Sequence, residues 1–493
     1  MKQRLLLFLV LIFPILSGCS QNPATGKHDF TAFMSPEDEL RVGQEEHPKI
    51  LKQYGGNYND VKLGKYISDV SFKLTQVAEL PNLTYTFTVL NESGVNAFAL
   101  PGGYIYITRG LLALVENEAE MAGVLAHEIG HVTARHTAQR YSKSVATNLG
   151  LNVVGILGSL YGAPTGAGNV LSLGAQLYLQ GYSREQELEA DKLAVRYLIR
   201  AGYDPNAMAT FFKKMQAHSN LQAKLAGKTG GEGEQFHALA THPRTAQRIV
   251  QAINLVKLAR IQNPRVGRST LLANIDGMVY GDDPKQGVRR GREFIHPGLQ
   301  IKFSVPPGFS MINTPSQVIA IGPNGSQIVF DAENDANAAR SYPNMAAYLT
   351  EKWGSRLNLR GVESISVNGL PAATGGNRLR LKSGVRDARL VAMRDSSGRI
   401  YRFTFLTPPN RTKSLTTELR RTTYSFRNLT TRELQTFRPL RIKVVTVRRG
   451  DTVSSLAARL PVERFQVELF EAINGISRNR ALKPGQKIKL IIN

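Results

Sequence analysis

The feature that most constrains this chain is the pentapeptide His127-Glu128-Ile129-Gly130-His131. Apolar residues recur around the pentapeptide at helical spacing, namely Met121, Val124, Leu125 and Val132. This spacing predicts a helix that begins near Asn117. Positions four apart on a helix share one face, so both imidazoles can bind one metal ion. Glu128 lies beside the first histidine and can contact a water molecule on that metal. Zinc suits such ligands and lowers the pKa of its water to ~7, which lets the glutamate take a proton.

A catalytic zinc needs a third protein ligand and an open fourth position. The longer metzincin motif does not continue here, because Ala134 and Thr137 stand where its Gly and third His would be. His136 is therefore predicted to be structural or to support a ligand. The better source of a ligand is the acidic segment Ser183–Asp191, although a run of carboxylates can also be a solvated helix face. Spacing alone does not choose among Glu185, Glu187 and Glu189.

The pattern His-Glu-x-x-His, followed by Ser-Arg-x-x-Glu-x-x-Ala-Asp, resembles a zinc metallopeptidase family that includes HtpX and the CAAX prenyl proteases. The resemblance is greatest to its BepA-like periplasmic lipoprotein branch and covers roughly residues 21–258. It implies one Zn²⁺ per chain, with Glu187 as the third ligand. It also implies that Asp191 takes part in catalysis by orienting a ligand histidine, which would fix the tautomer of that imidazole.

Two further segments match this family. The run that opens with Asn96, Ala97 and Phe98 resembles the strand before the active-site helix, and its edge would pair with an extended substrate. An ordinary half-buried hairpin is the alternative, and the two interpretations are compatible. Thr241-His242-Pro243 resembles a loop whose histidine can occupy the fourth zinc position. His242 would then switch the enzyme off when bound and could stabilise an oxyanion when released.

The N-terminus has the pattern of a secretion signal. Residues 1–18 combine a basic start, an apolar run and small residues, and Cys19 follows as the only cysteine. The apolar run is too short for a comfortable membrane span. The segment resembles a bacterial lipoprotein signal, so Cys19 is expected to carry lipid, and Ser20 favours the periplasmic face of the outer membrane. The alternative is a chance cysteine after a cleaved signal.

The net charge of +24 is strongly basic. Such a positive net charge suggests a nucleic-acid partner. The predicted location in the cell envelope argues against one, so we expect no nucleic-acid partner. Anionic phospholipid, cell-wall polymer and acidic polypeptide fit this charge better.

At 493 residues the chain is long enough for about three domains. After the signal we expect a tether and first helix over 19–45, then a mainly α zinc-peptidase domain of gluzincin type, with a small sheet, over 46–262. Within it, the Gly- and Ala-rich stretch 145–179 is a candidate lid. An α+β domain without a readable role is expected over 263–440, where BepA-like proteins carry helical repeats instead.

Residues 441–493 are predicted to form a strand, two helices and a strand. Gly450-Asp451, Asn474-Gly475 and Pro484-Gly485 mark the turns. The segment resembles a LysM domain, a βααβ module that binds N-acetylglucosamine-containing glycans such as peptidoglycan. A small structural domain with degenerate binding is the alternative, since only Phe465 and Phe470 are available for sugar stacking.

Together these features lead us to expect a lipid-anchored zinc endopeptidase of the periplasm. Its partners would be polypeptide substrates such as misfolded envelope proteins, the membrane and peptidoglycan, and its role would be envelope protein quality control. Two alternatives stay open. One is a periplasmic chaperone or peptidoglycan-associated binding protein with a latent zinc site, and the other is an enzyme that hydrolyses cell-wall peptides.

Overall fold

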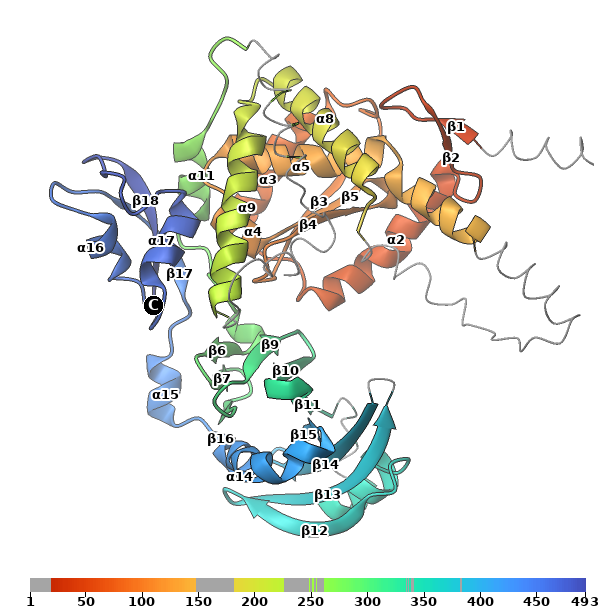
Figure 1. Ribbon diagram of the computed structural model, residues 1–493, viewed down its shortest axis with the longest axis vertical. Helices are drawn as coiled ribbons and strands as arrows, with labels where there is room; N and C mark the ends of the chain where they lie inside the picture. The colour runs from red at the N-terminus through yellow and green to blue at the C-terminus, as the bar shows by residue number, and fades with distance from the viewer. Residues whose placement is uncertain are drawn as a thin grey trace, which may run out of the picture. The chain divides into compact units, whose positions relative to one another are not determined.

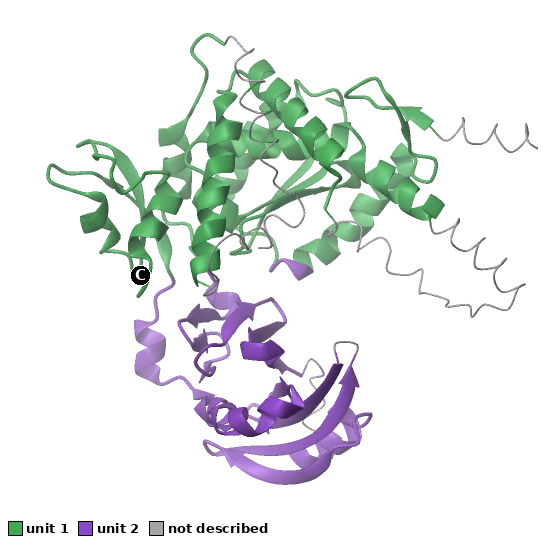
Figure 2. Cartoon of the chain, viewed as in Figure 1, with its two compact units in different colours: residues 1–52, 56–280, 440–493 green, residues 53–55, 281–439 purple. Residues whose placement is uncertain are grey.

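The computed structural model describes residues 19–147, 181–225, 248, 251, 254, 261–333, 335, 337, 341–381 and 384–493. The predicted signal peptide, His242 and nearly all of the candidate lid lie outside the described residues. The chain divides into two compact units (Figure 2). Unit 1 contains residues 1–52, 56–280 and 440–493, and unit 2 contains residues 53–55 and 281–439.

The first described element of unit 1 is a two-stranded ribbon, and most of the described elements that follow, up to residue 280, are helices (Figure 1). The ribbon pairs β1 (Cys19–Gln21) with β2 (His28–Phe30). The helices are α2 (Pro36–Gln53), α3 (Val61–Thr75), α4 (Arg109–Leu114), α5 (Glu118–Thr133), α8 (Arg184–Arg200), α9 (Asn206–Leu225) and α11 (Arg268–Ile275). Ser35 caps the start of α2, because its hydroxyl accepts a hydrogen bond from the backbone N–H of Asp38.

The small sheet predicted for this region has three strands in the order β3-β5-β4. β3 (Thr86–Leu90) runs parallel to β5 (Tyr104–Thr108), and β4 (Ala97–Leu100) runs antiparallel to β5. The short 3₁₀ turn η1 (Pro101–Gly103) connects β4 to β5. β4 is therefore an edge of this sheet.

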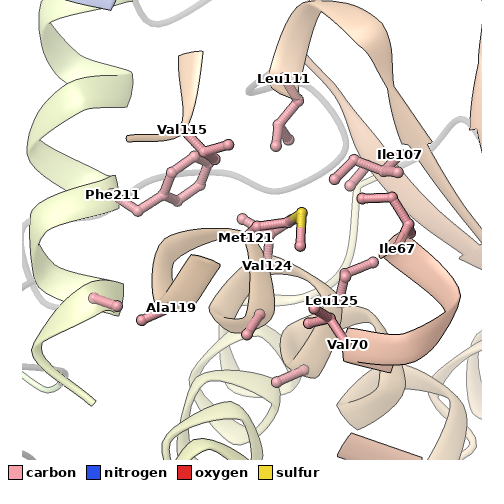
Figure 3. Close-up of a cluster of buried hydrophobic side chains, with 14 of the residues drawn as sticks. Ile67, Val70, Ile107, Leu111, Val115, Ala119, Met121, Val124, Leu125 and Phe211 are labelled. Atoms are coloured by element: carbon pink, nitrogen blue, oxygen red, sulfur yellow. The ribbon is translucent and has the colours of Figure 1, made fainter. Parts of the chain in front are cut away.

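The core of unit 1 lies between the sheet and the helices that cover it. Figure 3 shows side chains of α3, β5, α4, α5 and α9 meeting in one apolar cluster. The labelled members include Ile67, Ile107, Leu111, Leu125 and Phe211. Helix α5 is buried along almost its whole length, so this core holds the helix that carries the pentapeptide.

The C-terminal segment of unit 1 has the predicted strand, helix, helix and strand. These are β17 (Arg441–Thr446), α16 (Val453–Ala457), α17 (Gln466–Asn474) and β18 (Lys487–Ile492), and β17 pairs antiparallel with β18. The segment has its own apolar cluster, yet it also contacts the end of α4 in the same unit. Lys489 is fully buried, and its Nζ donates to the carbonyl oxygens of Ala113 and Val115, both at 2.8 Å.

Unit 2 is an α+β body built on antiparallel sheets. One sheet has the order β12-β13-β14-β15-β11-β10-β9, and the other has the order β16-β8-β7-β6. The strands are β6 (Val288–Arg290), β7 (Glu293–His296), β8 (Ile301–Ser304), β9 (Ser310–Asn313), β10 (Gln317–Ile321), β11 (Gln327–Ala332), β12 (Arg360–Val367), β13 (Leu370–Leu381), β14 (Gly384–Arg394), β15 (Ile400–Thr407) and β16 (Arg427–Asn428). The helical segments are η5 (Pro284–Gln286), η6 (Pro323–Gly325), α13 (Met345–Ala347), η7 (Tyr348–Trp353), α14 (Pro409–Ser425) and α15 (Thr431–Thr436).

Its core is rich in aromatic rings, including Phe303, Phe330 and Phe403. Strands β10 and β11 form one antiparallel hairpin, and β14 and β15 form another. The fold class expected from the sequence is thereby confirmed. Across the described ranges, no helix is both long enough and apolar enough to cross a membrane.

Candidate metal centre

The centre is built on α5, whose start is capped by Asn117. The Asn117 side-chain oxygen accepts a hydrogen bond of 2.8 Å from the backbone N–H of Glu120. Further along, a Cβ on Gly130 would lie 3.2 Å from Leu193 and 3.3 Å from the carbonyl oxygen of Ala190. The glycine therefore lets α8 approach α5 closely, which brings carboxylates of α8 within reach of the histidines of α5.

Helix α8 begins with a capping box that fixes its first turn. Ser183 accepts a hydrogen bond from the backbone of Gln186, and the Gln186 side chain accepts one from the backbone of Ser183. Glu187, one residue further on, is buried. Its ligand atoms and those of His127 and His131 all lie within 4.8 Å of one another, the single such group found among the described residues.

The distances within this group suit a small tetrahedral ion. The two Nε2 atoms of His127 and His131 are 3.0 Å apart. Carboxylate oxygens of Glu187 lie 3.6 Å from Nε2 of His127 and 3.5 Å from Nε2 of His131. Zinc bonds of about 2.0–2.1 Å in a tetrahedron imply ligand separations of about 3.4 Å. The donor set of two imidazoles and a carboxylate is also one that zinc prefers.

The three neighbouring glutamates of α8 have different surroundings. Glu185 is exposed in the first turn, and Glu187 faces the two histidines. Glu189 lies on another side of the helix, where its carboxylate is 3.0 Å from Nε2 of His136. The structure thus separates three residues that spacing left equivalent.

Each histidine of the group has a partner at its other ring nitrogen. Nδ1 of His127 is 3.0 Å from Asp191, and Nδ1 of His131 is 2.8 Å from Nδ1 of His136. Partners of this kind would orient both imidazoles for a metal ion bound at their Nε2 atoms. His136, predicted to be structural or to support a ligand, contacts a member of the group.

Buried carboxylates are the dominant charged groups of the centre. Burial lowers the pKa of His127, but hydrogen bonds with Asp191 and Glu187 outweigh burial and raise that pKa to about 9. Burial raises the pKa of Asp191, but the guanidinium of Arg248 outweighs it, so that pKa is lowered overall. The carboxylates therefore favour a cation at this position, which is what a divalent metal would provide.

Glu128 lies in the same buried cluster. Its side chain is 2% exposed, and its charge raises the pKa values of Tyr182 and Arg248. A buried carboxylate one residue from the first histidine is in the position expected for the proton acceptor of metal-assisted hydrolysis.

Two residues at the centre were not predicted from the sequence. Arg248 forms a two-point ion pair with Asp191, at 2.7 and 2.8 Å, and also contacts the carboxylate of Glu187. The ring of Tyr182 stacks on that of His131 with a centroid distance of 3.7 Å. Tyr182 directly precedes the Ser-Arg motif, which could have drawn attention to it. Arg248 has no comparable signal, because it lies 57 residues from the carboxylate it binds.

The other predicted site residues fall into three groups. Asn96 directly precedes β4, and Ala97 and Phe98 are its first two residues; among the described strands β4 pairs only with β5. Cys19 is exposed in β1. His242 is outside the described residues, so its predicted switch role stays a prediction.

The sequence of the chain matches known families in two places. Residues 62–255 match the model of peptidase family M48, and residues 445–490 match that of the LysM domain.

Three relatives illustrate the likeness. The beta-barrel assembly-enhancing protease of Escherichia coli O157:H7 is 32% identical over 226 residues, which are 44% of each chain. The mitochondrial metalloendopeptidase OMA1 of Schizosaccharomyces pombe is 29% identical and covers 44% of this chain and 60% of its own length. The metalloprotease LoiP of Escherichia coli K12 is 26% identical and covers 50% of this chain and 94% of its own length. The chain spans about half the length of the beta-barrel assembly-enhancing proteases that it matches, 58% in one case and 44% in another.

Proposed function

From the peptidase family M48 domain that this chain carries at residues 62–255, we propose that the protein is a zinc-dependent endopeptidase of the cell envelope. The observation that carries the proposal is the convergence of His127, His131 and Glu187 within 4.8 Å, beside the buried Glu128. These three residues would hold one Zn²⁺ per chain. Bound there, zinc would supply Lewis acidity that makes water more acidic and polarises a peptide carbonyl.

The residues of the chain supply the proton transfers and the orientation. The Glu128 carboxylate accepts a proton from the attacking water and delivers it to the leaving amine nitrogen. Asp191 holds Nδ1 of His127, at 3.0 Å, and so fixes that imidazole. Arg248 keeps Asp191 ionised through its two-point ion pair.

The substrates we propose are extended polypeptides. The sheet edge formed by Asn96 and by Ala97 and Phe98 of β4 would offer backbone groups to which a peptide of any sequence could add as a strand. Relatives with the printed name beta-barrel assembly-enhancing protease support a role in quality control of envelope proteins, with misfolded polypeptides as substrates.

The location we propose is the periplasmic face of the outer membrane. Lipid on Cys19, which is exposed at the start of β1, would anchor the chain, and the LysM domain at 445–490 would bind peptidoglycan. His242 would act as a removable fourth ligand.

The test measures zinc content and casein cleavage of the signal-less protein, beside Glu128→Gln and His242→Ala. We expect one zinc per chain in the wild type and in Glu128→Gln. Cleavage should fall by at least about 100-fold in Glu128→Gln and rise in His242→Ala. Zinc without cleavage in all three proteins would favour a binding protein with a latent site. New amino termini in purified sacculi would instead indicate hydrolysis of cell-wall peptides.

A further inference from the structure

A pocket of about 510 Å³ adjoins the metal centre at the carboxyl end of β4. Its lining comes from three parts of unit 1: the end of β4 with η1, the loop 79–83 that precedes β3, and the N-terminal segment up to the first turn of α2. His131 and Tyr182 line it as well, so it is continuous with the site described above. Its size lies within the range of specific ligand sites in proteins.

The walls of the pocket are mainly apolar. The side chains that define it are Leu40, Leu80, Leu83, Leu100, Val132 and Tyr182. Leu40 is 46% exposed, although its side chain is large and apolar. An apolar side chain at the mouth of an apolar pocket is available to a ligand.

The charged groups around the pocket are already paired within the protein. The carboxylate of Glu39 accepts a hydrogen bond of 2.8 Å from Arg135. The carboxylate of Glu79 lies 3.0 Å from Arg196 and 3.1 Å from Arg200. A charged ligand would have to compete with these ion pairs, whereas a neutral apolar group would not.

The N-terminal wall is held in place from the end of α5. Besides Glu39, the guanidinium of Arg135 binds the carbonyl oxygen of Met34, at 2.9 Å, and the hydroxyl of Ser20, at 3.1 Å. These hydrogen bonds hold the N-terminal wall against the end of α5 before a substrate binds. Binding therefore does not require the entropic cost of ordering this wall.

A substrate paired with β4 would pass this pocket. In antiparallel pairing, the amino-terminal part of the substrate lies beside the carboxyl end of β4, where Ala99 and Leu100 line the pocket. Alternate side chains of such a strand point to the same face. One substrate side chain on the amino side of the scissile bond can therefore enter.

We infer that this pocket binds a large apolar side chain of the substrate, on the amino side of the cleaved bond, and so determines where the enzyme cuts. The inference rests on the proposed peptidase function and adds the class of residue that is selected. Leu40 is the specificity-determining residue most open to test, because its exposed side chain can be changed without opening the core.

The experiment compares wild type, Leu40→Glu and a matched control, Phe72→Glu. Phe72 is 63% exposed on α3 and does not line the pocket. Mass spectrometry first maps the bonds that the zinc-loaded wild type cleaves in casein. Peptides that differ only at the mapped position, with Phe, Ala or Arg, are then assayed for kcat/KM.

We expect Leu, Phe, Tyr and Met to be enriched at one fixed position before the cleaved bond. Leu40→Glu should lower kcat/KM for the Phe peptide by about 10-fold or more relative to the Ala peptide. It should also raise the relative rate for the Arg peptide, which a merely destabilised protein would not do. Phe72→Glu should leave all three ratios unchanged.

Cleavage with no apolar preference would overturn the inference while the proposed function stands. An equal loss for all three peptides in Leu40→Glu would also overturn it. If the zinc-loaded wild type cleaves neither casein nor any peptide, the proposed function fails, and this inference fails with it.

Discussion

At the scale of single residues, α8 shows how two positions along a helix change the role of a side chain. Glu187 and Glu189 point to different sides, because successive residues of a helix are about 100° apart. One faces the two histidines of the group, and the other is 3.0 Å from His136. Glu185 belongs to the exposed first turn. Chemically identical residues should therefore contribute unequally to metal binding.

We predict a graded response when each glutamate is changed to glutamine. Glu187→Gln should weaken zinc binding by more than about 100-fold, since a charged ligand is lost. Glu189→Gln should weaken it by about 10-fold, because His136 would hold His131 less firmly. Glu185→Gln should have no measurable effect. Competition with a chromogenic chelator gives the zinc dissociation constants, and equal values for the three variants would contradict this assignment.

At the scale of elements, the approach of α2 to η1 depends on one small residue. A Cβ on Gly43 would lie 2.3 Å from the carbonyl oxygen of Pro101 and 2.6 Å from the ring of Tyr104. Backbone and a partly buried ring are not free to move away. Gly64 on α3 offers a contrast, because a Cβ there would meet nothing within 4 Å.

Alanine at these two positions should have opposite effects on stability. Gly43→Ala should lower the free energy of unfolding by about 1–3 kcal/mol through overpacking. Gly64→Ala should raise it by about 0.5–1 kcal/mol, because alanine is the better helix former. Urea unfolding followed by circular dichroism measures both. Destabilisation of similar size in the two variants would mean that the close contact at Gly43 does not control the packing of α2.

The buried Lys489 links β18 to the end of α4. Its Nζ meets the carbonyl oxygens of Ala113, Leu114 and Val115 at 2.8, 3.4 and 2.8 Å. Those carbonyls lie at the carboxyl end of a helix, where a positive charge is favourable. Burial nevertheless lowers the pKa of this lysine well below its ordinary value, so desolvation opposes the hydrogen bonds.

We expect the hydrogen bonds to outweigh desolvation. Lys489→Met keeps the aliphatic stem and removes the donor, which should cost about 1–3 kcal/mol of stability. Lys487→Met, on the exposed start of the same strand, should change stability by less than about 0.5 kcal/mol. Chemical unfolding of the two variants provides the comparison, and a more stable Lys489→Met would show that the cost of burying the amine dominates.

Sequence reasoning was most successful where the signal is local. The helical spacing around His127 predicted α5, and the turn residues near Gly450 and Gly485 predicted the strand-helix-helix-strand order of the last segment. A local pattern does not indicate burial that depends on contacts with a distant part of the chain. Lys489 alternates with Ile488 and Leu490 as a solvent-facing residue of a strand would. It is buried because the second face of β18 packs on the end of α4.

At the scale of the whole molecule, the chain leaves unit 1 after residue 280 and returns at residue 440. The segment where the chain leaves unit 1 is hydrogen-bonded to the segment where it returns. The backbone N–H of Tyr280 donates to the carbonyl oxygen of Leu440 at 2.8 Å, and the N–H of Ile442 donates to that of Met278 at 2.9 Å. Ile442 also belongs to the apolar cluster that surrounds α5. Apart from residues 53–55, unit 2 is thus an insertion between two hydrogen-bonded segments of unit 1. Domains predicted as consecutive segments do not anticipate such an insertion.

Because these ends are adjacent, unit 2 should be removable. We predict that replacing residues 282–438 with a short Gly-Ser linker yields a folded protein, since a loop of a few residues can close the gap at small entropic cost. The shortened protein should bind one zinc and cleave casein within about threefold of wild type, as the metal ligands and the pocket lie wholly in unit 1. Zinc content, circular dichroism and casein cleavage measure this. A folded, zinc-loaded protein that no longer cleaves casein would show that unit 2 delivers or orients the substrate, whereas failure to fold would show that unit 1 depends on unit 2 for stability.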